Sequence, residues 1–345
     1  GINSMDSVSD VDANLEYGKY DKPLKGVLLI NCYIKKGNRL NVVEGIEFLD
    51  SNEDKNSVIW IDMLLPTIEE IRAVEDMFDM HFPTKQESEE IELSSRYWEE
   101  NNRIEINSYF LINDNNSAFN ETVSFILQGN LLISVRYKKL QSFNTFTKKL
   151  LISPREFKTG YSIFCQIIDI RIDADADTIE NLSKEITKIR KHVFTDYSND
   201  DEEILEKIST FEDLNMKIRE NLTDKQRILN SLLKSQKFVD DKNELPIMLK
   251  DIKSLIEHTN FNFERLDYLQ NIFIGILSIE QNKVIKIFTI VNVIFLPPTL
   301  IASIYGMNFE FIPELHWEYG YLFSIGFMIL ASITPILIFK KKGWI

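Results

Sequence analysis

The hydrophobic pattern of the chain changes abruptly after residue 286. Residues 287–305 read IFTIVNVIFLPPTLIASIY and residues 319–339 read YGYLFSIGFMILASITPILIF, and neither segment contains a charged residue. A hydrocarbon core of about 30 Å is crossed by roughly 20 apolar residues of helix, so both segments are long enough to span a bilayer. Core helices of a soluble protein are the alternative, but such length and uniformity are uncommon in them. The pattern therefore predicts two membrane spans.

The charges that flank these spans predict their orientation. Lys283 and Lys286 precede the first span and residues 340–342 are three lysines, whereas the linking segment 306–318 has no Lys or Arg. Because positively charged flanks stay in the cytoplasm, we expect both chain ends there, including the basic tail 340–345, and the linking segment outside. Three acidic residues would then form a rim at an external opening, unless they only keep the loop solvated: Glu310, Glu314 and Glu318.

Strand-like alternation of apolar and polar residues recurs through the first part of the chain, and a helix with Pro66 in its first turn interrupts it. Gln128-Gly129-Asn130 reads as a hairpin turn. We therefore expect an α/β domain over residues 23–160, followed over residues 161–240 by two long antiparallel helices with a break near residues 195–203. The expected strands cover residues 26–34, 41–49, 56–64, 102–112, 118–130 and 130–138.

A third helix is predicted to run without a stop signal from Pro246 through the first span to residue 305. Taken to Ile304, it would be about 88 Å long at 1.5 Å per residue, and an apolar stripe recurs along it at spacings of three, four or seven residues. A helix this long needs partners, so we expect a homo-oligomer with Leu266, Leu269 and Phe273 near its axis. The stripe comprises Leu249, Ile252, Ile256, Phe263, Leu266, Leu269, Phe273 and Ile276.

A second stripe, in the membrane part of this helix, carries uncharged polar residues. An amide exposed to lipid costs several kcal/mol, so Asn292 must face protein or water. The stripe is either a pore lining or a polar clamp between packed helices, and periodicity alone leaves both open. A pore of amides, hydroxyls and carbonyls suits a cation that keeps some of its water, particularly Mg²⁺. Pro297 and Pro298 would free carbonyl groups one turn earlier. Either these carbonyls turn into the lumen, or the prolines only produce a packing kink. The stripe comprises Asn282, Ile285, Thr289, Asn292, Leu296, Thr299 and Ser303.

Charge and composition exclude several classes of protein. The 345 residues carry a formal net charge of −14, all of it before residue 287, because three Glu and three Lys cancel afterwards. This is the wrong sign for nucleic-acid binding. Cys32, Cys165 and four scattered His offer no zinc spacing, and no phosphate loop, nucleophile elbow or triad is visible, so an enzyme is not expected. Residues 1–22 read as a flexible terminus without a signal peptide, and residues 1–4 look like a cloning remnant.

Several motifs resemble the CorA family of divalent-cation channels, in its magnesium-transporting bacterial branch. They are YGMNFEFIPEL at residues 305–315, FLPPTLIASIYGMN before it, KKKGWI at the end and, more loosely, WIDMLLPTIEEI and VSFILQGNLLISVRY. The resemblance implies a funnel-shaped homopentamer with an α/β cytosolic domain, an all-α stalk and two transmembrane helices. It also implies passive Mg²⁺ uptake across a bacterial or archaeal inner membrane, with Co²⁺ and Ni²⁺ as further candidate ions.

The same resemblance assigns roles to individual residues. Gly306, Met307 and Asn308 would form the external selectivity filter, in which the Asn308 amides hold a hydrated Mg²⁺. Ile285 and Leu296 stand where relatives often carry Met, and since both are apolar a hydrophobic gate is retained. The family's pore rings would fall on Asn282, Ile285, Asn292, Leu296 and Thr299, close to the face found from spacing.

The resemblance further implies regulation, since relatives close when intracellular Mg²⁺ binds acidic residues between neighbouring cytosolic domains. The relatives' adjacent acidic pair appears here as Glu87 followed by Ser88, so the correspondence is loose, and solvated surface carboxylates are the alternative. Two other functions stay open: a zinc transporter of the same superfamily, whose members tend to carry Ile in place of Met307, and a non-transporting membrane anchor or sensor. The candidate regulatory residues are Glu87, Glu89, Glu90, Asp169, Asp173, Asp177 and Asp251.

Overall fold

A computed structural model describes residues 30–45, 55–89, 96–114, 117–195, 201–237 and 239–343. The chain divides into two compact units, residues 1–267 and residues 268–345. We call them the N-terminal and the C-terminal unit and describe each by itself. The predictions for residues 1–22 and for Glu90 lie outside the described residues.

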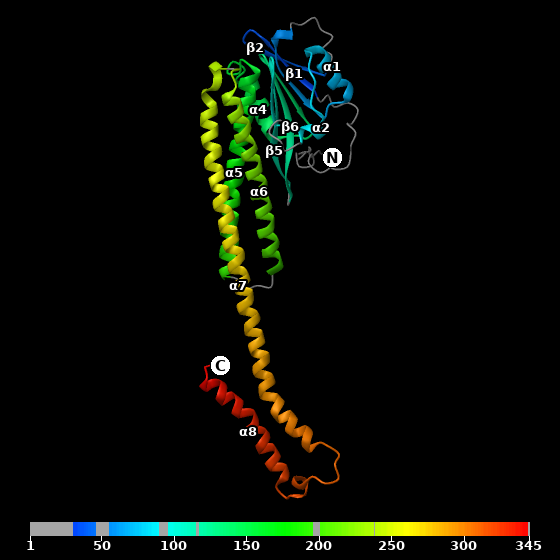
Figure 1. The fold of residues 1–345 in the computed structure, drawn as a ribbon, viewed down its shortest axis with the longest axis vertical. Coiled ribbons are helices and arrows are strands. Elements are labelled where there is room, and N and C mark those ends of the chain that lie inside the picture. The colour runs from blue at the N-terminus through cyan, green and yellow to red at the C-terminus, as the bar shows by residue number, and fades with distance from the viewer. Residues whose placement is uncertain are drawn as a thin grey trace, which may run out of the picture. The chain divides into compact units, whose positions relative to one another are not determined.

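The N-terminal unit is built on a seven-stranded sheet (Figure 1). Its strand order is β2-β1-β3-β7-β6-β5-β4, and neighbouring strands are antiparallel except β3 and β7, which pair in parallel with Trp60 opposite Leu132. The hairpin turn predicted at Gly129 is confirmed: this glycine has a φ of +58°, a left-handed conformation that glycine adopts without strain. The strands are β1 Ile30–Lys36, β2 Arg39–Glu44, β3 Val58–Leu64, β4 Tyr97–Glu100, β5 Arg103–Asp114, β6 Ser117–Gln128 and β7 Leu131–Arg136.

Helices cover both faces of this sheet (Figure 1). On one face Val74 of α1 packs in a cluster with Ile61 and other apolar strand residues. Trp60, the neighbour of Ile61 on β3, points to the opposite face, where its ring lies 5.4 Å from that of Phe146 on α4. The helices are α1 Ile68–Phe78, α2 Lys85–Ser88, α4 Gln141–Ile152, α5 Gly160–Thr195 and α6 Asp201–Lys234, with the 3-10 helices η3 Lys55–Ser57 and η4 Val239–Glu244.

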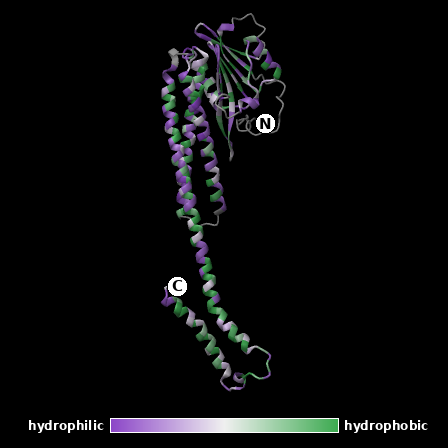
Figure 2. Ribbon diagram, viewed as in Figure 1, coloured by the Kyte–Doolittle hydropathy of each residue, from purple (hydrophilic) through white to green (hydrophobic). Residues whose placement is uncertain are grey.

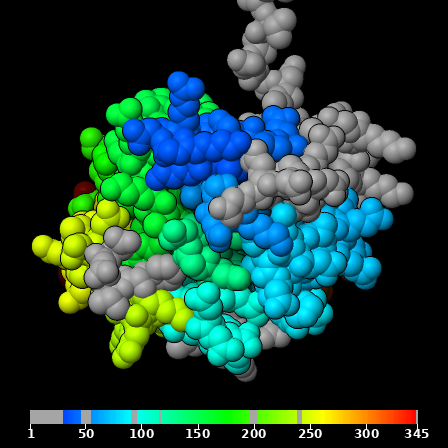
Figure 3. Space-filling view, turned by 90° about the horizontal axis from the view of Figure 1, so that it is seen from above, coloured from blue at the N-terminus to red at the C-terminus, as the bar shows by residue number. Residues whose placement is uncertain are grey.

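The two long helices predicted after the sheet are present as α5 and α6, and the start of α7 (Leu245–Tyr305) packs with them. The side-chain amide of Asn215 on α6 donates to the carbonyl of Thr259 on α7 at 2.9 Å, and Arg265 of α7 donates to the hydroxyl of Ser183 on α5 at 2.7 Å. Seen from above, the yellow start of α7 lies on the opposite side of the unit from α1 (Figure 3).

This packing corrects one prediction about α7. Leu266, which we expected near an axis between copies, is 0% exposed in the single chain. Leu269 and Phe273 are also buried within one chain. Up to Leu266, the apolar stripe read from the sequence therefore serves helix packing within the N-terminal unit, because α5 and α6 supply the partners that an isolated helix would lack.

The C-terminal unit consists of the end of α7, the 3-10 helix η5 Pro313–His316 and helix α8 Gly320–Lys341. α7 ends and α8 begins close to the residues predicted for the two spans, and both helices are long and apolar enough to cross a membrane. Figure 2 shows the apolar residues of this unit distributed around both helices, in contrast to the mixed pattern of α5 and α6. Most of these apolar side chains are exposed in one chain.

Candidate functional site

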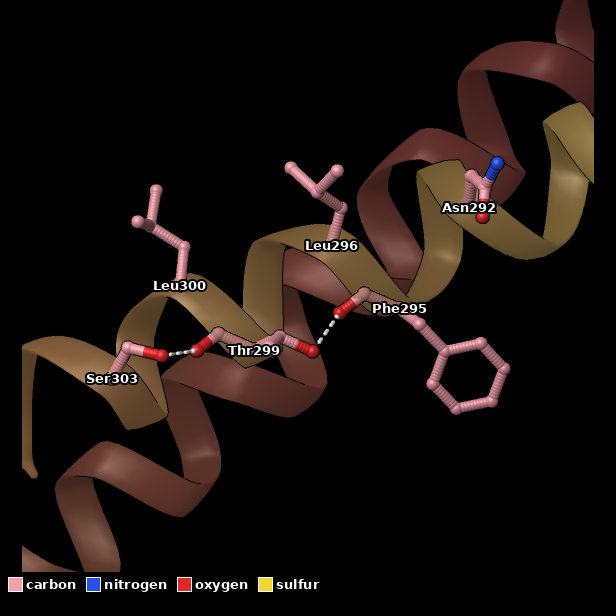
Figure 4. Close-up of a pocket in the computed structure, with 6 residues that line it drawn as sticks. All are labelled: Asn292, Phe295, Leu296, Thr299, Leu300 and Ser303. Atoms are coloured by element: carbon pink, nitrogen blue, oxygen red, sulfur yellow. Dashed lines mark hydrogen bonds between the residues drawn. The ribbon is translucent and has the colours of Figure 1, made fainter.

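The polar stripe of α7 occupies one face of the helix in the C-terminal unit. At about 100° per residue, its members lie within about 100° of arc, and all of them are exposed in the single chain. Ile294, Pro297 and Ile301 are less exposed, and the same rotation places them on the opposite side of the helix. In Figure 4 the ribbon of α8 passes behind α7, while Asn292, Thr299 and Ser303 lie on the near side of α7 and Leu296 points to its upper side. The polar face thus points away from α8.

Three hydroxyl groups on this face are turned back onto the helix. Thr289 donates to the carbonyl of Ile285 at 2.8 Å, Thr299 to that of Phe295 at 2.6 Å, and Ser303 to that of Thr299 at 2.8 Å. Figure 4 shows the last two of these bonds. Because the hydroxyl protons are used in this way, the oxygen lone pairs remain available as acceptors. Such a surface accepts hydrogen bonds from water or from the hydration shell of a cation.

A shallow hollow lies along the same face. Its walls include the exposed Leu296 and Leu300, whose side chains point to one side of the helix, whereas Phe295 points away (Figure 4). The hollow contains the residues Asn292, Phe295, Leu296, Thr299, Leu300 and Ser303. The structure therefore brings Asn292, Leu296 and Thr299 together, as the spacing predicted, with apolar and polar side chains alternating along the helix.

The two prolines of α7 do not add carbonyl groups to this face. Pro297 and Pro298 lack the N–H groups that would bond the carbonyls of Val293 and Ile294. These two residues lie about 100° and 200° around the helix from Asn292 by the same rotation, and both are half-buried. Of the two interpretations of the proline pair, the structure favours the packing kink.

The predicted filter follows directly after the last turn of α7. Gly306 donates from its backbone N–H to Ala302 at 2.9 Å, and Met307 donates to Ile304 at 3.3 Å, so both remain tied to the helix end. The Asn308 side chain is exposed beyond them. Gly306 does not use a left-handed conformation, as a tight glycine turn would. Its constraint is steric, because an added Cβ would lie 3.1 Å from the carbonyl oxygen of Ala302.

The acidic loop residues occupy different settings. Glu310 and Glu318 are exposed, whereas Glu314 lies in η5 and is half-buried. Aromatic side chains surround them, including Phe311 and Trp317, which are 77% and 52% exposed. Aromatic residues of this kind are typical of the boundary between a membrane and water.

The candidate regulatory acids fall into two groups. On α5, Asp169 is half-buried and Asp173 is exposed, and partial burial raises the pKa of both carboxyls. Their neighbours raise it further: Asp173, Glu244 and Asp251 act on Asp169, against Lys149, while Asp177 and Asp251 act on Asp173. The four candidate residues of α5 and α7 therefore share one electrostatic cluster, to which Glu244 of η4 also belongs. Within the described part of a single chain, however, no three or more acidic, His or Cys residues converge to hold a metal ion.

The second group is associated with α2. Glu87 accepts hydrogen bonds from the backbone N–H and the hydroxyl of Thr84 at 2.8 and 2.9 Å, which lowers the pKa of its carboxyl. It completes a capping box for this short helix, a role that the spacing Thr84-x-x-Glu87 signals and that our sequence reading missed. Glu89 follows at the end of the helix and is exposed.

Sequence reasoning also missed a buried network of charged side chains in the N-terminal unit. Arg96 pairs with Asp224 of α6 at 2.8 Å, and Arg171 pairs with Asp175 of α5 at 2.5 Å. Lys225 lies between them and donates to the carbonyl of Tyr109 and to the side chain of Asn221. Burial lowers the pKa of Lys225 to about 8, although Asp175 and Asp224 act to raise it. The only sign of this network in the sequence was the spacing of four residues between Arg171 and Asp175 on α5 and between Asn221 and Lys225 on α6.

The family model and the curated relatives agree on one family. The family model described as CorA-like Mg²⁺ transporter protein matches residues 55–341. A magnesium transport protein CorA from Wolinella succinogenes is 42% identical over 323 residues, covering 92% of this chain and 100% of that protein. One from Escherichia coli is 33% identical over 320 residues with the same coverage. The complete CorA magnesium transporter structure from Methanocaldococcus jannaschii matches with a TM-score of 0.76 at 18% identity, covering 92% of this chain and 99% of that one.

Proposed function

The chain belongs to the CorA-like Mg²⁺ transporter family, and on that premise we propose that it conducts hydrated Mg²⁺ passively across a membrane along the polar face of α7. The observation that carries this proposal is that this face is exposed and points away from α8. An exposed Asn292 amide cannot face lipid at low cost, so it faces water or a neighbouring copy. A central pore surrounded by copies of α7, with α8 outside, meets that requirement.

The chemistry of the face suits a cation that keeps its hydration shell. Mg²⁺ loses water reluctantly, and neutral acceptor oxygens can bind its first-shell waters weakly enough to release them. The oxygen lone pairs of Thr289, Thr299 and Ser303 are available for this, because their protons are bonded to the helix. Ile285 and Leu296, 52% and 66% exposed on the same face, supply apolar rings where a narrow pore would lose its water and close.

Selection takes place at Asn308, which with Gly306 and Met307 lies at the external mouth of the pore. A ring of Asn308 amides presents neutral oxygens to a hydrated ion, and the acidic residues of the loop raise the local cation concentration. This arrangement requires both chain ends in the cytoplasm. Co²⁺ and Ni²⁺ share the charge and approximate size of Mg²⁺, so they are further candidate ions.

A homopentamer supplies the copies that the pore requires. With Leu266, Leu269 and Phe273 buried inside the protomer, the contacts between copies fall to the exposed apolar residues of α7. Phe261 and Tyr268 are 57% and 56% exposed and lie seven residues apart, which places them on one helix face. These two side chains replace the buried stripe as the proposed contact around the axis.

Regulation by intracellular Mg²⁺ at acidic sites between copies fits the donor chemistry of the N-terminal unit. Carboxylates are the ligands Mg²⁺ prefers, and mutual repulsion in the cluster of Asp169, Asp173, Asp177 and Asp251 would be relieved by a divalent cation. Because the described residues of one chain do not complete a metal site, further carboxylates from a neighbouring copy are required. Glu87, which caps α2, and Glu89 are the candidates for that second contribution.

Two other functions have less support. The curated relatives at 33% identity or more carry the name magnesium transport protein, which favours Mg²⁺ over zinc, and Met307 is retained in the filter. A non-transporting anchor or sensor would have no use for an exposed polar face on a membrane-length helix. The proteins of this family are ion transporters, and no enzymatic activity is proposed.

The test is uptake of Mg²⁺ into proteoliposomes containing the purified protein. Asn308→Ala should abolish or sharply reduce uptake while the oligomer stays intact, because it removes one ring of amide oxygens. Asn260→Ala, which changes an exposed amide of the same helix in the N-terminal unit, is the matched control and should conduct like the parent. Normal uptake by Asn308→Ala would mean that the filter lies deeper, at Asn292 or Asn282. Competition by Co²⁺, Ni²⁺ and Zn²⁺ in the same assay ranks the ions.

A further inference from the structure

Gly320, the first residue of α8, has no room for a side chain. A Cβ added to it would lie 2.0 Å from the carbonyl oxygen of Glu314 and 3.1 Å from its carbonyl carbon. Both neighbours are backbone atoms, which cannot move aside as the end of a flexible side chain can. The glycine is buried, although most of the surrounding unit is exposed. The absence of a side chain at Gly320 therefore allows the backbone of Glu314 to lie directly against the start of α8.

Further contacts fold the segment around Glu314 onto α8. The backbone N–H of Gly320 donates to the carbonyl of Trp317 at 3.0 Å, and that of Trp317 donates to Glu314 at 3.4 Å. The Trp317 ring lies 5.6 Å from the ring of Phe323, one turn into α8. Residues 312–320 thus form a compact cap that belongs to α8.

The other half of the loop has different attachments. Gly306 and Met307 make their backbone bonds to the last turn of α7. Asn308 follows immediately and is exposed, as is Phe309. Phe311 is also exposed, and its ring is the contact of this half with the cap, 5.9 Å from the ring of His316. The proposed filter residue is consequently held by α7, while the acidic residue Glu314 is held by α8.

We propose that Gly320 is a positioning residue that holds the backbone of Glu314 against α8 and so sets the place from which its carboxylate acts, so that cation collection and ion selection are carried by two different helices. This inference rests on the proposed function, because it assigns Glu314 the task of raising the cation concentration at the filter. A carboxylate held at a fixed place near the mouth concentrates divalent cations there. When the carboxylate is displaced, salt and water screen its charge before it acts at the filter. Loss of the cap should therefore weaken ion capture and leave conduction through the filter unchanged.

Uptake kinetics with Gly320→Ala test the positioning role. The expected result is a several-fold increase in the Mg²⁺ concentration for half-maximal uptake at low ionic strength, with an unchanged maximal rate. Gly326→Ala is the matched control, since a Cβ at this glycine of α8 would meet no atom within 4 Å. In the background of Glu314→Gln, Gly320→Ala should have no additional effect, because the charge that it positions is already gone. An additive loss, or a fall in maximal rate alone, would overturn the proposal.

Hydrogen exchange provides a readout that does not require transport. In the parent protein, the amides of Trp317 and Gly320 should exchange more slowly than those of Phe309 and Phe311, and Gly320→Ala should remove this protection while Gly326→Ala retains it. Uniformly fast exchange over residues 313–320 in the parent would overturn the proposal even if the variant fails to fold. If the parent shows protection but transports no Mg²⁺, the cap is retained, and both the role in ion capture and the proposed function are rejected.

Discussion

Leu266 and Leu300 lie on the same helix, yet the first is 0% exposed in a single chain and the second is 57% exposed. The difference follows the division into two units. The N-terminal unit buries Leu266 with its own helices, because α5 and α6 pack against the start of α7. The C-terminal unit has only α8 and a short loop to offer, so Leu300 must find its apolar surroundings in lipid or in another copy. One continuous helix therefore has a first part that is packed within its own chain and a second part that is not.

The polar groups of the two units differ in the same way. In the N-terminal unit, Asp224 accepts hydrogen bonds from Arg96, from the hydroxyl of Ser108 and from the backbone of Tyr109. Buried charges of this kind are tolerated only with partners. On the polar face of the C-terminal unit, Asn292 remains exposed. An exposed polar group on an otherwise apolar helix indicates a surface that contacts water or a second copy.

The largest expected effect comes from shortening Leu266. Leu266→Ala should lower the free energy of unfolding of the detergent-solubilised protein by about 2–5 kcal/mol, because it removes buried methyl groups and leaves a cavity. Leu300→Ala, the matched change on the exposed part of the helix, should alter it far less. Thermal unfolding followed by circular dichroism measures both. Equal losses in the two variants would contradict the division into a self-packed and an open unit.

A second prediction concerns Lys225 and pH. Its pKa of about 8 in the folded protein lies below the ordinary value near 10.4 in an unfolded chain. Between these values the unfolded chain binds more protons, so the free energy of unfolding should rise with pH above 8, by an amount on the order of a few kcal/mol. Lys225→Met should remove this rise. Thermal unfolding between pH 7 and pH 9.5 measures it.

Lys225 packs against Tyr109 and Phe110 of β5, and the charged groups that act on it come from other elements. They are Asp175 and Arg171 of α5, Asp224 of α6 and Arg96 next to β4. Lys217→Met, a change at a more exposed lysine of the same helix, is the control and should keep the rise in stability. A flat pH profile in the parent protein would mean that water reaches the network and that Lys225 titrates as it does in solution.

A smaller effect is expected at Asp173. Burial and the carboxylates of Asp177 and Asp251 raise its pKa, so the folded protein disfavours the charged form of Asp173. The free energy of unfolding should therefore fall as the pH rises through the ordinary carboxyl range. Asp173→Asn should therefore raise the melting temperature without divalent cations and reduce the increase caused by Mg²⁺. Asp213→Asn, on α6 outside this cluster, is the control. A Mg²⁺ response identical to that of the parent would remove Asp173 from the proposed regulatory set.

The smallest effect is expected at the loop. Glu314→Gln should reduce Mg²⁺ uptake only at low Mg²⁺ and low ionic strength, since a charge at the mouth acts over about 8–10 Å at physiological salt. The rate at saturating Mg²⁺ should stay unchanged. A loss that persists in high salt would indicate that Glu314 has a structural or direct binding role instead.

Sequence patterns predicted the helices better than the sheet. The long helices follow from apolar periodicity and both spans from the length of two uncharged apolar segments, which are local properties of the chain. β4, α2 and α4 were missed, because a four-residue strand and a four-residue helix carry little periodic signal, and Gln141 begins α4 without a capping side chain. The parallel pairing of β3 with β7 could not be read from the sequence either, since it joins Asp62 to Ser134, which are separated along the chain by β4, β5 and β6.

The candidate site shows a similar limit. Spacing alone placed Asn292, Leu296 and Thr299 on one exposed face, because a helix repeats every 3.6 residues. Spacing did not reveal that Leu266 is buried in its own chain, because an apolar stripe looks the same whether its partner is a neighbouring copy or a neighbouring helix. The approach of Gly320 to Glu314 depends on the fold of the loop, which has no period to detect.

The topology of the N-terminal unit also has a consequence for biosynthesis. The sheet is complete in sequence once β7 has been made, and the side of β5 that contacts Asp224 is covered once α6 ends at Lys234. The first membrane-length apolar segment begins only at Ile287. At the ribosome's rate of roughly 5–20 residues per second, synthesis of the residues between these two points takes roughly 3–10 s, longer than many domains of this size need to fold. The insertion machinery therefore receives a nascent chain whose sheet is already complete in sequence, and it must recognise a span that emerges late behind that sheet.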